Sequence, residues 1–264
     1  MTRSIRMPAA VMAIVAPLVI LAPFTIAAAA ERDIRPTADA TAFLAPPGEP
    51  ASAFPNPNRP VAEIISPIFD SEAARDKGKE TEQVFKLMNI KPGMTVADIG
   101  AGSGYYTVRL AKTLGPQGRV LAQDITPNYL RDLNARVVKL KLRNVTVSRG
   151  EAHDPRLPRD SVDAAVLIHM YHEIAQPFAL LHNLAAAMKP GGIVGILDAD
   201  RDTSAHGTPP ALLRCELAAM GYREMSFTTL SGGLGYLAVF EAPNVTARKP
   251  HGEIKACPAE GKKR

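Results

Sequence analysis

The sequence lacks the markers of several common protein classes. It contains no Gly-Lys-Ser or Gly-Lys-Thr triplet, which excludes a phosphate-binding P-loop, and it contains no internal repeat, which argues against a repeat architecture. Cysteine is scarce, since Cys215 and Cys257 are the only two in the chain. In an oxidising compartment they could pair, and two free thiols are an equal alternative because the sequence does not place their Cα atoms within reach.

No strongly charged face is predicted, although the formal net charge is +5. Arg3 and Arg6 lie near the N-terminus, and residues 248–264 carry six basic and two acidic side chains. These two terminal segments contain the whole positive excess, so the rest of the chain is close to neutral. We therefore expect no nucleic-acid partner.

The first 30 residues have the pattern of a signal peptide. Arg3 and Arg6 precede a run over residues 7–30 without a charged side chain, and the run ends in four alanines before Glu31. A basic start, an apolar middle and a small-residue end are typical of a segment that signal peptidase removes. We therefore expect export to the periplasm. The alternative is an uncleaved inner-membrane anchor through residues 7–30, because that run is long enough to span a bilayer.

Composition divides the remainder of the chain into three segments. Residues 31–60 hold seven prolines and no apolar period, which is typical of an extended linker or arm. Residues 61–242 show regular apolar patterns and form the one predicted domain. The basic tail at residues 243–264 is expected to be solvated.

Within this domain, apolar strands alternate with amphipathic helices. This alternation predicts an α/β fold with a mostly parallel seven-stranded sheet and helices on both faces. Only a glycine-rich turn separates the two closing strands, so the last strand is expected to be antiparallel. The predicted strands span residues 94–99, 120–124, 145–148, 163–168, 192–198, 224–230 and 236–240, and the predicted helices include residues 108–114, 130–140, 178–188 and 212–220.

A glycine-rich loop joins the first predicted strand to the following helix. Gly100, Gly102 and Gly104 would let the backbone approach a ligand closely at the start of that helix. A dinucleotide loop needs a third glycine where this chain has Tyr105, so a nicotinamide-linked dehydrogenase is disfavoured. Asp98 would repel a pyrophosphate, whereas its carboxylate can hold the ammonium of an amino-acid ligand; capping of the turn is the alternative role.

This loop resembles the first motif of class I S-adenosylmethionine-dependent methyltransferases, and later motifs follow in that family's order over about residues 80–242. Asp124 ends the second strand, where the family's acidic residue receives the ribose hydroxyls. Glu151 and Ala152 resemble the adenine-edge segment, with Glu in place of the usual Asp. The resemblance implies a Rossmann-like methyltransferase fold, and is strongest to predicted exported bacterial methyltransferases. The implied cofactor is S-adenosylmethionine, held by Asp98, Gly100, Gly102, Gly104, Asp124, Glu151 and Ala152.

The acceptor of the methyl group is expected near the end of the fourth strand. His169 and His172 are the candidate bases there, and Tyr171 is a further candidate for a catalytic hydrogen bond. The alternative is a loop in which Tyr171 packs and both histidines are merely hydrogen-bonded. We expect no metal, because this stretch offers no third ligand at a known spacing.

Two functions follow from this interpretation. The first is an S-adenosylmethionine-dependent methyltransferase acting on an unidentified small molecule. The alternative is an exported, non-catalytic protein that binds the cofactor or a nucleotide, because S-adenosylmethionine is made in the cytosol and export would separate the protein from it. A membrane is expected to be a partner only through the N-terminal segment, if that segment is uncleaved.

Overall fold

The computed structural model describes residues 1, 41–63, 71–244, 246 and 249–258. The predicted signal peptide lies, apart from Met1, outside these residues. No helix in the described part of the chain is long and apolar enough to cross a membrane.

Seven strands form one mixed sheet in the order β3-β2-β1-β4-β5-β7-β6. The strands from β3 to β5 pair in parallel, and β7 runs antiparallel to both of its neighbours. The predicted sheet and its antiparallel last strand are thereby confirmed. The strands are β1 (Thr95–Ile99), β2 (Arg119–Asp124), β3 (Val145–Arg149), β4 (Val162–Ile168), β5 (Met188–Asp198), β6 (Arg223–Thr229) and β7 (Tyr236–Glu241).

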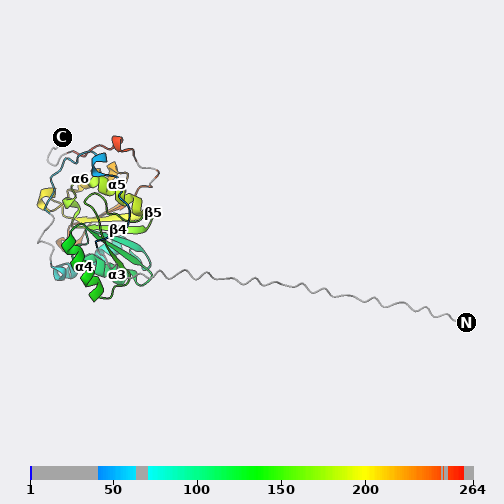
Figure 1. Cartoon of the computed structure of the whole chain (residues 1–264). Coiled ribbons are helices and arrows are strands. Elements are labelled where there is room, and N and C mark those ends of the chain that lie inside the picture. The colour runs from blue at the N-terminus through cyan, green and yellow to red at the C-terminus, as the bar shows by residue number, and fades with distance from the viewer. Residues whose placement is uncertain (2–40, 64–70, 245, 247–248, 259–264) are drawn as a thin grey trace. The chain divides into compact units, whose positions relative to one another are not determined.

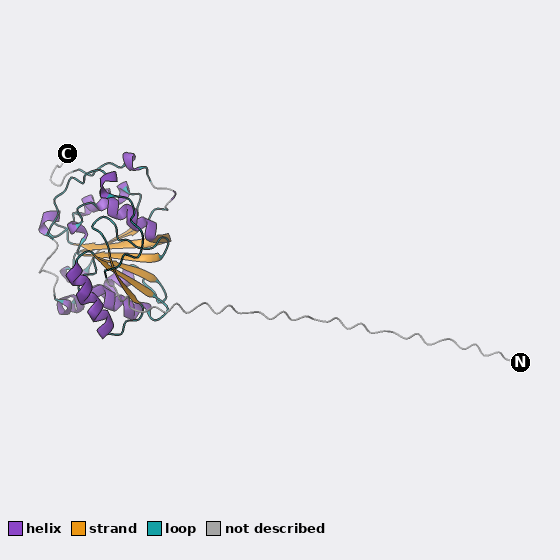
Figure 2. Ribbon diagram, in the orientation of Figure 1, coloured by secondary structure: helices purple, strands orange, loops and turns teal. Residues whose placement is uncertain are grey.

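Helices cover both faces of this sheet (Figures 1 and 2). One face is covered by α2, α3 and α4, and the other by α5 and α6. Short helix α1 precedes α2 along the chain. The helices are α1 (Glu72–Lys77), α2 (Glu80–Leu87), α3 (Tyr105–Leu114), α4 (Pro127–Lys139), α5 (Pro177–Ala187) and α6 (Pro210–Ala219).

Strict alternation of side chains along the strands gives each face its own apolar core. In β1, Val96 packs in the core beneath α3, whereas Ala97 and Ile99 pack in the core beneath α5. Because both faces are buried, the strands appear in the sequence as continuous apolar runs rather than as alternating ones. This is why the strands could be located from the sequence.

Strand β5 begins earlier than predicted. Its first residue, Met188, pairs with Val162, so the Lys-Pro-Gly-Gly segment lies inside the strand instead of before it. A register shift follows between Val162 and Ala164, and Gly191 has a positive φ of 75°. A positive φ is strained for a side chain but open to glycine, so Gly191 permits this irregular start.

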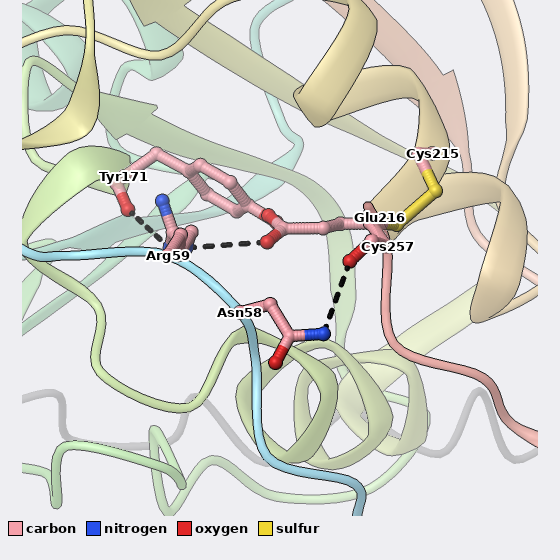
Figure 3. Close-up of a disulfide and its surroundings, with 6 residues drawn as sticks. All are labelled: Asn58, Arg59, Tyr171, Cys215, Glu216 and Cys257. Carbon is pink, nitrogen blue, oxygen red and sulfur yellow. Dashed lines mark hydrogen bonds and ion pairs between the residues drawn. A yellow bond between two sulfur atoms is a disulfide. The ribbon is translucent and has the colours of Figure 1, made fainter. Parts of the chain in front are cut away.

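The arm and the tail both pack against the domain. Phe54 of the arm is buried, and the backbone N–H of Ala62 donates to the carbonyl of His172. Cys215 of α6 forms a disulfide with Cys257 (Figure 3), and Ile254 of the tail is buried. Residues 249–258, the longest described part of the tail, therefore differ from the solvated segment that its charge predicted, because a buried apolar side chain and a disulfide anchor them.

Candidate functional site

A cavity of about 290 Å³ opens at the carboxyl ends of the central parallel strands. This edge, where strand order reverses between β1 and β4, is where open α/β sheets bind ligands. The loops after β1, β2, β3 and β4 all contribute to its walls. Its lining includes residues 99–103, Gln123, Asp124, Glu151, Ala152, residues 168–170 and Glu173.

The glycine-rich loop has the backbone that its sequence predicted. Gly100, Gly102 and Gly104 all have positive φ angles, of 68°, 53° and 87°. A Cβ atom on Gly102 would meet nothing, whereas one on Gly104 would collide with Leu133 of α4. Gly102 thus leaves space open for a ligand, and Gly104 lets the loop pack against the helix.

Asp124 is held rigidly at the end of β2 and lines the cavity. Its Oδ2 accepts a hydrogen bond from the backbone N–H of Gly102 at 2.8 Å, and its Oδ1 accepts one from that of Thr126 at 2.8 Å. Each carboxylate oxygen keeps a second lone pair for a ligand. A fixed carboxylate beside an open glycine backbone fits the vicinal diol and the sugar edge of S-adenosylmethionine.

Asp98 lies deeper than its expected contact with a ligand requires. It is not among the described residues that line the cavity, and its Oδ2 accepts a hydrogen bond of 2.6 Å from the Thr107 hydroxyl of α3. Burial raises the pKa of Asp98 to about 6, although the Thr107 hydrogen bond acts in the opposite direction. Its contact with the cofactor's ammonium stays a prediction.

Glu151 and Ala152 line the cavity after β3, as expected for the adenine edge. Glu151 Oε1 forms an ion pair with Arg156 Nη1 at 3.1 Å. The arginine orients the longer glutamate side chain that replaces the family's aspartate. The contact of Glu151 and Ala152 with the adenine ring stays a prediction.

A buried polar cluster around Glu80 borders the cavity and was missed by sequence analysis. Glu80 Oε1 accepts hydrogen bonds from Arg75 and from the Tyr106 hydroxyl, and Oε2 lies 3.3 Å from His169 Nε2. Burial alone would raise the pKa of Glu80, but the hydrogen bonds from His169 and Arg75 outweigh it and lower the pKa to about 2. Glu80 is therefore ionised at neutral pH.

His169 is the one candidate base that lines the cavity among the described residues. It follows β4 with a φ of 55°, and its backbone N–H donates to the carbonyl of Leu197. The ionised Glu80 favours the tautomer in which Nε2 carries the proton. The pair of tyrosines after the glycine loop also separates, because Tyr105 lines the cavity and Tyr106 reaches Glu80.

Tyr171 does not lie where its candidate catalytic role requires. Its side chain is fully buried beneath α6, and its hydroxyl donates to Glu216 Oε2 at 2.8 Å. Burial raises the pKa of Tyr171 well above its ordinary value, with the Glu216 carboxylate acting in the same direction. The ring belongs to the apolar core on the α5 and α6 side of the sheet, so packing is the role that the geometry supports.

His172 lies behind the cavity wall that Glu173 forms. Its Nδ1 is 3.0 Å from Asp198 Oδ1, at the end of β5, and its ring is fully buried. Glu173 lines the cavity, and burial raises its pKa to about 7, although His172 acts in the opposite direction. His172 itself therefore does not line the cavity, whereas its neighbour Glu173 does.

Replacing Glu80 by glutamine should remove a large, pH-dependent contribution to stability. The folded-state pKa of Glu80 is depressed, so the stabilisation is present above pH 4.5 and is lost as the pH falls toward 2. The three groups facing it are Arg75, Tyr106 and His169. At pH 7 we expect Glu80→Gln to cost about 3 kcal/mol of unfolding free energy, shrinking at pH 3, measured by urea denaturation.

Glu82→Gln is the matched control for this measurement. Glu82 lies on the same helix and is exposed, so its replacement should change stability little at either pH. Equal effects of the two substitutions at pH 7 would contradict the assigned role of the buried carboxylate.

Comparison with known proteins agrees with this geometry. A family model described as a methyltransferase domain matches residues 96–192. The chain is 26% identical over 142 residues to a demethylmenaquinone methyltransferase of Listeria monocytogenes, covering 52% of this chain and 60% of that enzyme. It is 26% identical, with a TM-score of 0.56, to a solved S-adenosylmethionine-dependent methyltransferase of Aquifex aeolicus, covering 63% of this chain and 96% of that one.

A third similarity concerns the fold alone. A solved structure described as a possible exported protein from Bordetella parapertussis is 15% identical, with a TM-score of 0.52, and covers 64% of this chain and 68% of that one.

The region that the methyltransferase family model matches contains the glycine loop, Asp124 and the loop with His169. The cofactor of this site is S-adenosylmethionine. Its sheet order, its glycine-loop geometry and the methyltransferase domain that it matches are those of the class I S-adenosylmethionine-dependent methyltransferases.

Proposed function

We propose that this protein transfers the methyl group of S-adenosylmethionine to a small-molecule acceptor. The observation that carries the proposal is a single cavity that combines the Asp124-anchored glycine loop with the His169–Glu80 pair. The first part fits the cofactor, and the second offers a base at the place where an acceptor would lie. A protein that only bound the cofactor would not need the second part.

The cofactor, when bound, supplies an electrophilic methyl group on a sulfonium. Asp124 would receive the ribose hydroxyls, and the open backbone at Gly102 would admit the sugar and the amino-acid portion. His169 would take the proton that the acceptor loses, and the ionised Glu80 beside it would stabilise the resulting positive charge on the ring. Holding the acceptor in line with the methyl group supplies the rest of the rate enhancement.

The cavity walls bear on the class of acceptor. Around His169, apolar side chains line the cavity: Ile168, Met170, Ile174 and Leu180. They suit a partly apolar small molecule that carries one ionisable group for His169 to deprotonate. The chain spans 60% of the length of the Listeria methyltransferase, whose name gives demethylmenaquinone as its acceptor, so a shared acceptor does not follow.

Asp124→Asn tests the cofactor site directly. The change removes the charge and one hydrogen-bond acceptor that the ribose diol would use, so affinity for S-adenosylmethionine should fall about 10- to 150-fold. The measurement is isothermal titration or equilibrium dialysis of the full chain with S-adenosylmethionine, with NAD as the competing ligand class.

Asp132→Asn is the control, because Asp132 is exposed on the next helix and should leave affinity unchanged. The wild-type chain should bind no NAD. Failure of the folded wild-type protein to bind S-adenosylmethionine at millimolar concentration would overturn the proposal, and an unchanged affinity in folded Asp124→Asn would overturn the assigned role of this carboxylate.

We also propose that the protein is exported to the periplasm, with the uncleaved anchor as the other outcome. The basic start and the uncharged run over residues 7–30 motivate this proposal. The pairing of Cys215 with Cys257 supports it, because structural disulfides persist in oxidising compartments and are rare in the cytosol. The state of these two cysteines in cells therefore bears on location.

A further inference from the structure

Three groups of metal-ligand type meet beside the cavity, two from consecutive residues and the third from a later turn of the chain. His172 and Glu173 belong to the short 3₁₀ turn after β4, and His206 follows the 3₁₀ turn Thr203–Ala205 after β5. One ligand atom from each of the three lies within 4.8 Å of the others. The carboxyl ends of β4 and β5 are neighbours in the sheet, and this adjacency brings the two turns together.

One ring nitrogen of each histidine in this cluster has no hydrogen-bond partner among the described residues. His172 Nε2 and His206 Nδ1 are both buried without such a partner. The nearest acceptor to His172 Nε2 is Glu173 Oε1 at 3.8 Å, which is too far for a hydrogen bond. Buried polar atoms are normally satisfied, so two unsatisfied ring nitrogens beside one carboxylate indicate a missing partner.

The ring of His172 is already oriented as a metal ligand. Its Nδ1 is 3.0 and 3.1 Å from the two oxygens of Asp198, whose position is fixed by the backbone N–H of Ala199 and the hydroxyl of Thr208. The Asp198 carboxylate accepts a hydrogen bond from Nδ1–H, which leaves the lone pair of the ring on Nε2. A carboxylate behind a histidine is the usual support of a metal-bound imidazole.

We propose that His172 Nε2, the Glu173 carboxylate and His206 bind one divalent transition-metal ion of the zinc class. Two imidazoles and one carboxylate form a ligand set that such ions accept, with at least one coordination position left open. For bonds of about 2.1 Å, tetrahedral ligand atoms lie about 3.4 Å apart, so atoms that now lie within 4.8 Å of one another must approach by at most about 1.4 Å. Glu173 and His206 are half-buried rather than fully packed, which leaves them room to move.

The open coordination position of the ion could bind the methyl acceptor. Glu173 also lines the cavity, so the ion would lie at the wall of that cavity, on the side of the loop that follows β4. An oxygen or sulfur atom of an acceptor could occupy the open position. The ion itself would bind whether or not S-adenosylmethionine does, so this inference and the proposed function can fail separately.

Metal binding to the full chain tests the inference without any assay of methyl transfer. The protein is treated with a chelator, dialysed, and titrated with ZnCl₂ and with CoCl₂ as a spectroscopic probe. We expect one ion per chain by elemental analysis and a visible Co²⁺ absorption band. His206→Ala should weaken binding by more than about 100-fold, and Asp198→Asn by about 10- to 100-fold.

Two further variants keep the test decisive. Glu173→Gln removes a ligand at a half-buried position, and should weaken binding as His206→Ala does in a protein whose melting temperature shows that it is folded. His153→Ala removes a half-exposed histidine outside the cluster and should leave binding unchanged. Absence of saturable binding at micromolar metal, or equal losses in His153→Ala and His206→Ala, would overturn the site.

Discussion

Replacing Arg59 by alanine is expected to lower the free energy of unfolding by about 3–5 kcal/mol, because it leaves a buried charge without its partner. Arg59 Nε lies 3.2 Å from Glu216 Oε1, and each side chain is only 1% exposed. The same guanidinium donates to the backbone carbonyl of Tyr171 at 3.1 Å (Figure 3) and to that of Ile174 at 2.9 Å. Urea denaturation with the disulfide intact measures the change.

Arg214→Ala is the matched control. Arg214 lies on the same helix as Glu216, and its substitution removes an arginine from an exposed ion pair with Glu224. Its cost should stay within about 1 kcal/mol. Combining Arg59→Met with Glu216→Leu should recover only part of the loss, because the apolar pair needs no charge compensation but leaves the Tyr171 hydroxyl and the carbonyls of Tyr171 and Ile174 without these partners. Equal costs for Arg59→Ala and Arg214→Ala would show that the buried pair is not a major source of stability.

Arg59 also connects the N-terminal arm to the functional loop. By holding the carbonyls of Tyr171 and Ile174, it fixes both ends of the turn that presents His172 and Glu173. The Arg59→Ala variant should therefore bind metal more weakly even where it remains folded. The arm at residues 41–63 is in this sense part of the domain, because it supplies a charge that the interior requires.

The fold was predictable because burial of both sheet faces leaves a strong pattern in the sequence. Continuous apolar runs marked the strands of the parallel sheet, and apolar spacing such as that of Leu130, Leu133 and Val137 marked the helices. The glycine loop and Asp124 were also predictable. Their backbone geometry and their place at a strand end are local properties, which a short motif can carry.

The remaining functional residues depend on contacts that no local pattern encodes. Glu80, Arg59 and His206 are polar residues outside recognisable motifs, and polar residues are usually exposed. Each meets a partner from a distant part of the chain: His169 for Glu80, Glu216 for Arg59 and the cluster at His172 for His206. Tyr171 shows the reverse case, since its neighbours in the sequence suggested chemistry while its side chain packs in the core.

Loss of the disulfide between Cys215 and Cys257 should cost about 4 kcal/mol, the loop-closure value for its separation of 42 residues. Cys257→Ala and reduction of the wild-type protein by dithiothreitol should lower the unfolding free energy alike, whereas dithiothreitol should not affect the double variant Cys215→Ala/Cys257→Ala. A stability unchanged by reduction would show that the tail is held by packing at Ile254 and by the hydrogen bond from Asn58 to Cys257 instead.

The same two cysteines link stability to location. If the protein is exported, as we propose, the two cysteines should resist labelling by a maleimide in intact cells, because the thiols are paired. A chain without residues 2–30 would stay in the reducing cytosol, where we expect both thiols to be labelled and the domain to be less stable by the same 4 kcal/mol or so. Labelling of the full-length chain to the same extent as the shortened one would argue against export, and the tail would then be free to leave α6 in the cell.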